Sequence, residues 1–150
     1  MGARIHFVFK EKDELPAVVL YSHWGEDEWP RDLAMALDHA RPRWTDGSYV
    51  TRMIISYLMQ DSLLGSTGFG IYAIPDGGNV GDLGDHTIIV DIVQETVLDL
   101  DTNAKADWDL FVREIIKHKP FWEPLQGMDR NDWKARFWGF DKAERTLKAF

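Results

Sequence analysis

The segment VVLYSHWG, residues 18–25, decides how the chain is organised. Its first half is apolar and β-branched, which is typical of a buried strand, and its second half is polar and aromatic. Where a strand leads into a helix, rigid elements hold the side chains while the turn exposes them. We therefore expect the functional site around Tyr21, His23 and Trp24.

A second strand precedes this segment in the sequence. Residues 5–9 read IHFVF, and the charged stretch KEKDELP, ending at Pro16, separates them from the strand at residues 17–21. A short charged loop between two apolar runs is typical of a hairpin. The sequence thus predicts an antiparallel pair.

Three helices are predicted from apolar spacing. The first begins at Trp29-Pro30, because proline suits a first helical turn, and Pro42 ends it. The second is capped by Thr45 or Asp46 and ends before Gly65; apolar residues at helical spacing give it one buried face (Val50, Met53, Ile54, Tyr57 and Leu58). The third covers residues 107–118 and buries Trp108, Phe111, Val112 and Ile115.

Three further strands are expected at residues 67–74, 86–93 and 96–100. Runs of strands alternating with pairs of helices favour the α+β class, in the order β-β-α-α-β-β-β-α-α. We predict a single domain over residues 1–150, with helices packed on a mostly antiparallel five-stranded sheet. Residues 129–150 form a basic and aromatic helical tail, with Trp133 and Trp138 among its aromatic groups.

Composition narrows the class of protein. The chain has 150 residues, of which 45% are hydrophobic and 28% charged, so it is long and apolar enough for one folded core. It has no cysteine, which excludes disulfides and zinc-thiolate sites. No apolar run approaches the roughly 18 residues that cross a bilayer, and no signal peptide is evident, so we expect a cytoplasmic protein without a membrane partner.

The charge distribution argues against binding of duplex nucleic acid. Net charge is −8; residues 1–129 carry 11 basic and 22 acidic side chains, a balance of −11, whereas residues 130–150 have a balance of +3. An acidic body repels phosphates. The basic, aromatic tail either contacts a partner or closes the core against the acidic body.

Ligand recognition is the first interpretation of the site. Arg52 and Tyr49 share a helix face, where a guanidinium and a stacking ring suit an anionic or nucleotide-like molecule, although a solvated face has the same pattern. Gly68 and Gly70 lie on one face of a strand and admit either a ligand or the aromatic side chain of a neighbouring helix. The predicted ligand-binding residues are Tyr21, His23, Trp24, Tyr49, Arg52, Gly68 and Gly70.

Catalysis is the alternative. His23 is the residue of the segment that suits general base chemistry, and Asp91, placed inside an apolar strand, would orient it; a structural role for His23 is as well supported. The five histidines show no HxxxH or HxH spacing, so we predict no metal site and no cofactor, and a site of His23, His86 and Asp91 could arise only through the fold.

Several of these pieces together resemble uncharacterised small bacteriophage-encoded proteins. The shared pieces are the aromatic-Ser/Thr-His-Trp-Gly segment at residues 21–25, an alanine and leucine helix at 33–40, an approach to a second helix at 43–52, and Thr-Gly-Phe-Gly-Ile at 67–71. Glu26 stands where a glycine follows in that pattern. The resemblance implies no activity.

Three functional hypotheses follow. The favoured one is a non-catalytic cytoplasmic binding protein that holds a small anionic or nucleotide-like ligand, with sequestration of a host metabolite or signal as the use that the resemblance implies. The second is a small hydrolase that uses His23 and Asp91. The third is an interaction module that binds a host protein, or a second copy of itself as a homodimer, through exposed tryptophans.

Overall fold

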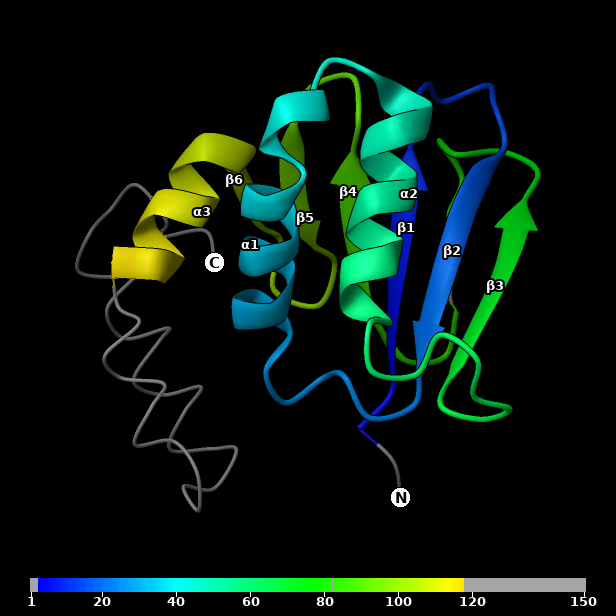
Figure 1. Cartoon of the computed structure of the whole chain (residues 1–150). Helices are drawn as coiled ribbons and strands as arrows, with labels where there is room; N and C mark the ends of the chain where they lie inside the picture. The colour runs from blue at the N-terminus through cyan, green and yellow to red at the C-terminus, as the bar shows by residue number, and fades with distance from the viewer. Residues whose placement is uncertain (1–2, 82, 118–150) are drawn as a thin grey trace.

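The computed structural model describes residues 3–81 and 83–117. In this part of the chain, six strands form one sheet in the order β3-β2-β1-β4-β5-β6, and three α-helices accompany it (Figure 1). The elements are β1 (Ile5–Lys10), β2 (Ala17–Ser22), α1 (Trp29–His39), the short 3-10 helix η1 (Arg41–Arg43), α2 (Gly47–Leu58), β3 (Phe69–Ile74), β4 (His86–Asp91), β5 (Thr96–Asp99), β6 (Ala104–Asp107) and α3 (Trp108–Lys117).

The sheet confirms the α+β class but not the predicted five strands. Both expected hairpins form, because β1 pairs antiparallel with β2 and β4 pairs antiparallel with β5. The centre of the sheet, however, is the parallel pair of β1 and β4, so the sheet is mixed. The sixth strand, AKAD in β6, has too little β propensity to be found by pattern, and pairing with β5 holds it.

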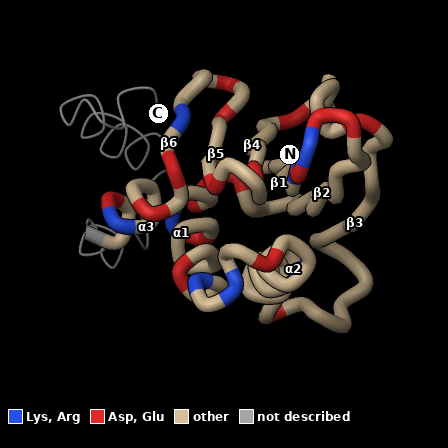
Figure 2. Tube along the Cα trace, turned by 90° about the horizontal axis from the view of Figure 1, so that it is seen from above, with Lys and Arg blue, Asp and Glu red and all other residues tan. Residues whose placement is uncertain are grey.

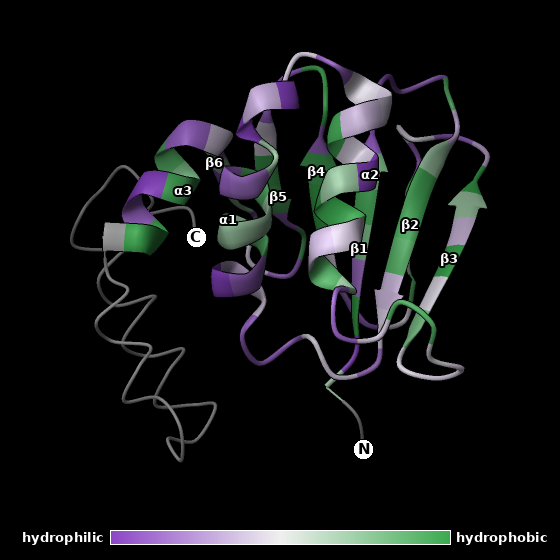
Figure 3. Ribbon diagram, viewed as in Figure 1, coloured by the Kyte–Doolittle hydropathy of each residue, from purple (hydrophilic) through white to green (hydrophobic). Residues whose placement is uncertain are grey.

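All three helices cover one face of the sheet, as the view along its edge shows (Figure 2). The main core lies between them, and its largest members are completely buried; they include Trp29, Leu37, Ile54, Ile88, Trp108 and Phe111. Hydrophobic residues accordingly concentrate in the central strands and on the inner faces of the helices (Figure 3).

The opposite face carries a smaller apolar cluster around Val8, Val19 and Ile89. The connection from β3 to β4 passes over this face, where its Val80 and Leu83 pack on the cluster. Backbone hydrogen bonds fix the connection to the β1–β2 loop: the N–H of Gly77 donates to the Leu15 carbonyl over 2.7 Å. This connection places Asp85 beside His6, near the start of β1.

The structure confirms the predicted buried faces of α2 and α3, whereas the predicted helix ends agree less well. Val50 and Ile54 of α2 are buried, and the buried face of α3 is the expected one. Helix α2 ends at Leu58, several residues before Gly65, and Asp46 precedes it without a side-chain capping bond. In α3, by contrast, the Asp107 carboxylate accepts a hydrogen bond from the Leu110 N–H over 2.8 Å.

The predicted tail at residues 129–150, with Trp133 and Trp138, lies outside the described residues. None of the described helices combines the length and the apolar character needed to cross a membrane.

Candidate functional site

Polar groups gather at the end of the sheet where β1 and β4 begin and β2 ends. Ile5 pairs there with Ser22 on one side and with His86 on the other. Because strand side chains alternate between faces, His6 opens toward the helix-free face while His86 points toward the helices. Two clusters result. The open-face cluster comprises His6, Tyr21, His23, Trp24, Tyr72 and Asp85; the helix-side cluster comprises Glu26, His86, Asp99 and Asp101.

His6 is the centre of the open-face cluster. It is only 7% exposed, and its ring nitrogens contact the Asp85 carboxylate (Nε2 to Oδ2, 3.0 Å) and the Tyr72 hydroxyl (Nδ1 to Oη, 2.9 Å). An ionised carboxylate only accepts, so Nε2–H donates to Asp85 and Nδ1 accepts from Tyr72. Burial, and then the charge of Asp85, raise the pKa of the Tyr72 phenol above its usual 10. The phenol therefore stays protonated and serves as a donor.

Aromatic rings extend this cluster from β1 to the turn after β2. The Tyr21 hydroxyl lies 2.8 Å from Nδ1 of His23, and its ring meets the ring of His6 edge-on at 5.2 Å. His23 in turn packs edge-on against Trp24, with centroids 4.2 Å apart. Trp24 is 67% exposed. The result is a hydrogen-bonded aromatic surface with a largely exposed indole at its border.

The two predicted glycines border this surface. Gly70 pairs with Tyr21 across β2 and β3, and Gly68 accepts a backbone hydrogen bond from the His23 N–H over 2.9 Å. Gly68 has φ +96°, a conformation that glycine adopts without strain, and nothing lies within 4 Å of where its Cβ would be. The bare position at Gly70 meets the Tyr21 ring at 3.9 Å, so an aromatic side chain does approach it, but from strand β2 and not from a neighbouring helix.

Arg52 and Tyr49 lie elsewhere. Arg52 lines a groove of about 410 Å³ between α2 and the start of β2, together with Val18 and Ile71. Val18 is five residues from His23, about 16 Å along a strand, and faces the other side of the sheet. Tyr49 packs under the guanidinium of Arg43 at 4.6 Å. The predicted shared hollow around His23 and Arg52 is therefore not formed.

The predicted catalytic pair is also not formed. Asp91 is the last residue of the central strand β4, five residues and about 16 Å from His86, which begins that strand at the end of the sheet where His23 lies. The Asp91 carboxylate is buried, and its Oδ1 accepts hydrogen bonds from the N–H groups of Val93 (3.0 Å) and Gln94 (2.8 Å). It holds the β4–β5 turn, which gives this buried carboxylate the partner that its position requires.

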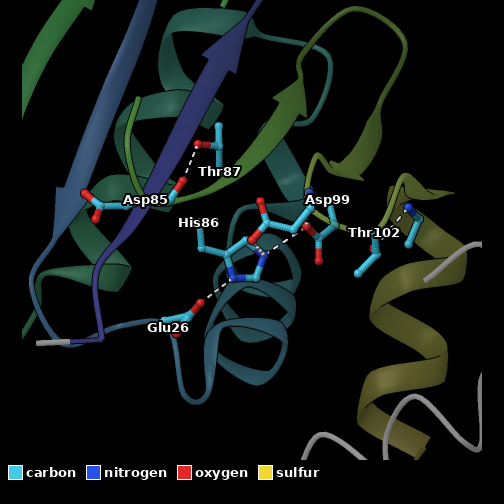
Figure 4. Close-up of polar contacts among 8 residues, drawn as sticks. Glu26, Asp85, His86, Thr87, Asp99 and Thr102 are labelled. Atoms are coloured by element: carbon cyan, nitrogen blue, oxygen red, sulfur yellow. Dashed lines mark hydrogen bonds and ion pairs between the residues drawn. The ribbon is translucent and has the colours of Figure 1, made fainter. Parts of the chain in front are cut away.

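The helix-side cluster places one imidazole between two carboxylates (Figure 4). Nδ1 of His86 lies 2.9 Å from Glu26 Oε2, and its Nε2 lies 2.9 Å from Asp99 Oδ1 and 3.9 Å from Asp101 Oδ2. Asp99 is completely buried, and its Oδ1 also accepts from the Asp101 N–H at 2.9 Å. Both ring nitrogens therefore face carboxylate oxygens.

A single turn connects the two clusters. His23 and Trp24 belong to the open face, and Glu26, two residues later, belongs to the helix side. Gly25 lies between them, and a Cβ there would stand 2.6 Å from the Ser22 hydroxyl. The Glu26 N–H donates to the Ala3 carbonyl over 3.0 Å, which fixes the turn to the start of the chain's first strand. Glycine is required here because the turn passes so close to β2.

The sequence predicted the part of this site at the end of β2, but not the groups that the other strands and turns contribute. The missed residues are His6, Glu26, Tyr72, Asp85, Asp99 and Asp101, and His86 was considered only as a partner of His23. A signal existed for His6, because it is the polar residue of an otherwise apolar strand. Nothing in the sequence shows that residues 85 and 86 return beside it, since the parallel pairing of β1 with β4 is long-range.

Comparison of the chain with protein families, with curated proteins and with solved structures finds no match, so its own geometry is the evidence for the site.

Proposed function

We propose that this protein is a non-catalytic binding protein whose ligand is a planar, nucleotide-like molecule held on the open-face cluster. The observation that carries the proposal is the exposed indole of Trp24, fixed by His23 at the edge of a hydrogen-bonded aromatic surface. A nucleobase stacks on such a face, with about 1–3 kcal/mol per base in known complexes. The side chains of His23 and Tyr72 add polar groups at its border.

Tyr72 takes part in the proposed binding as a protonated phenol. Asp85, His6 and Tyr72 follow the order of an acid, a base and a nucleophile, and a lowered pKa is one of the routes by which a nucleophile is activated. The pKa of Tyr72 is raised instead. The Tyr72 hydroxyl donates its proton to Nδ1 of His6, so its oxygen serves a ligand as an acceptor, for example for an amino group of a base.

The anionic part of the ligand has less support than the planar part. Arg52, the residue expected to bind a phosphate, lines a groove on the helix side of the sheet, away from Trp24. We therefore expect the base to contribute most of the affinity. The use that the bacteriophage resemblance implies, sequestration of a host metabolite or signal, stays a prediction, as does binding of a host protein through residues of the tail.

The experiment is a titration of the full chain, followed by tryptophan fluorescence, with the four ribonucleoside 5′-monophosphates and the matching nucleosides. At least one base should bind saturably, with similar affinity for nucleoside and nucleotide. Trp24→Ala should weaken it at least tenfold, or by about 1.4 kcal/mol. Tyr72→Phe should weaken it too, whereas Tyr49→Phe, a matched exposed tyrosine outside the cluster, should not.

Two results would contradict the proposal. One is the absence of saturable binding for every base in this set together with no small molecule retained by the purified protein in native mass spectrometry. The other is loss of binding in Arg52→Ala with no change in Trp24→Ala, which would move the ligand to the groove beside α2.

A further inference from the structure

The helix-side cluster has the donor atoms of a metal site. Glu26, His86 and Asp101 each offer one ligand atom, and these atoms all lie within 4.8 Å of one another. Ligands of an ion with bonds of about 2.1 Å lie about 3.0 Å apart when adjacent and about 4.2 Å apart when opposite. The three residues come from the turn before α1, from the start of β4 and from the β5–β6 turn. Their mutual distances, all within 4.8 Å, are therefore close to those around one ion.

A second observation comes from Asp99, which adjoins the three. Its side chain is 0% exposed, and its Oδ2 has no hydrogen-bond partner. A carboxylate oxygen that is buried without a partner costs free energy, and such groups are normally paired or bound to a metal. Its other oxygen holds Nε2 of His86, the arrangement in which a carboxylate orients a metal-binding imidazole. Figure 4 shows the Asp99 and Glu26 carboxylates on either side of the ring.

The charges of the cluster are unbalanced. Three carboxylates surround one imidazole, so even a doubly protonated ring supplies one positive charge against three negative ones. No ion pair found among the described residues joins Asp99 or Asp101 to a lysine or an arginine. A divalent cation would remove most of this excess.

The ligand types select the class of ion. One imidazole with carboxylates suits transition metals, whereas Ca²⁺ and Mg²⁺ prefer oxygen ligands alone, and the chain has no thiolate to offer. We propose that Glu26, His86 and Asp101 bind one divalent transition-metal ion, such as Zn²⁺ or Mn²⁺, with Asp99 positioning the imidazole of His86. The metal would take the place of the proton on Nδ1 of His86, and Nε2–H would keep its hydrogen bond to Asp99.

Isothermal titration calorimetry on the full chain tests this site, after removal of metals with a chelator and with ZnCl₂ and MnCl₂ as separate probes. One ion per chain should bind. Asp101→Asn should weaken the binding at least tenfold, because it removes a charged ligand oxygen. The variant should fold like the wild type, because the Asp101 side chain is 55% exposed. Asp61→Asn, an exposed carboxylate outside the cluster, should bind like the wild type.

A residue-specific measurement distinguishes this site from metal binding at other histidines. Mn²⁺ at this site should broaden the ring C–H signals of His86 in NMR spectra far more than those of His6, which lies on the other face of the sheet. Three results overturn the proposal: no saturable binding of either ion at millimolar concentration, equal affinities of the Asp101→Asn and Asp61→Asn variants, or broadening centred on His6 or His23.

Discussion

Replacing Asp99 by alanine should destabilise the fold by about 2–3 kcal/mol. The buried carboxylate accepts hydrogen bonds from the Asp101 N–H and from Nε2 of His86, each at 2.9 Å. Loss of the first costs about 1.5 kcal/mol, and a buried imidazole N–H without an acceptor costs about 2 kcal/mol. Removal of the unsatisfied Oδ2 returns about 1 kcal/mol, the lower end of the cost of such a group.

The assay is urea unfolding followed by circular dichroism, with a chelator present so that bound metal does not contribute. For a chain of this size the expected loss lowers Tm by about 5–10 °C. Asp99→Asn keeps both acceptor bonds and should lose about 1 kcal/mol. Asp101→Ala removes a side chain that is 55% exposed, so its free energy of unfolding should change by less than about 0.5 kcal/mol. Equal stabilities for the two alanine variants would refute the reasoning.

Three further predictions concern the two faces of the sheet. The pKa of Tyr72 should lie above its usual 10 in an absorbance titration, and Asp85→Asn should bring it down; because the folded-state pKa is raised, its stabilising contribution is present below about pH 10 and is lost as the pH rises through that pKa. Gly68→Ala should lose about 1 kcal/mol in urea unfolding because of the positive φ, whereas Gly70→Ala should stay within about 0.5 kcal/mol. Ile54→Ala removes a completely buried side chain of α2 and should lose about 2–5 kcal/mol in the same assay.

Local patterns predicted the parts of the fold that depend on nearby residues. The β1–β2 and β4–β5 hairpins and the buried faces of α2 and α3 follow from periodicity, because amphipathic spacing determines which side of an element is buried. Strand β6 was missed because Ala104 and Ala106 pack without β-branched or aromatic side chains.

The candidate site was predicted in part for the same reason. Tyr21, His23 and Trp24 are neighbours in the sequence, and their contacts follow from one strand end. Arg52 was assigned to the same hollow from its chemistry alone, although it lines a groove beside the start of β2, on the helix side of the sheet. Long-range pairing decides which polar residues meet, and no short motif encodes it.

That pairing also has a consequence for how the chain reaches its native state. Strand β1 leaves the ribosome before its parallel neighbour β4, which follows about eighty residues later in the sequence. The two strands can therefore pair only after helices α1 and α2 have been made. Folds dominated by such distant contacts form slowly, because a long loop must close before the contacts reward it. During synthesis the β1–β2 hairpin therefore has no partner for the backbone groups on the outer edge of β1 until β4 is made. A nascent chain released before residue 91 lacks the complete β4 strand at the centre of the sheet.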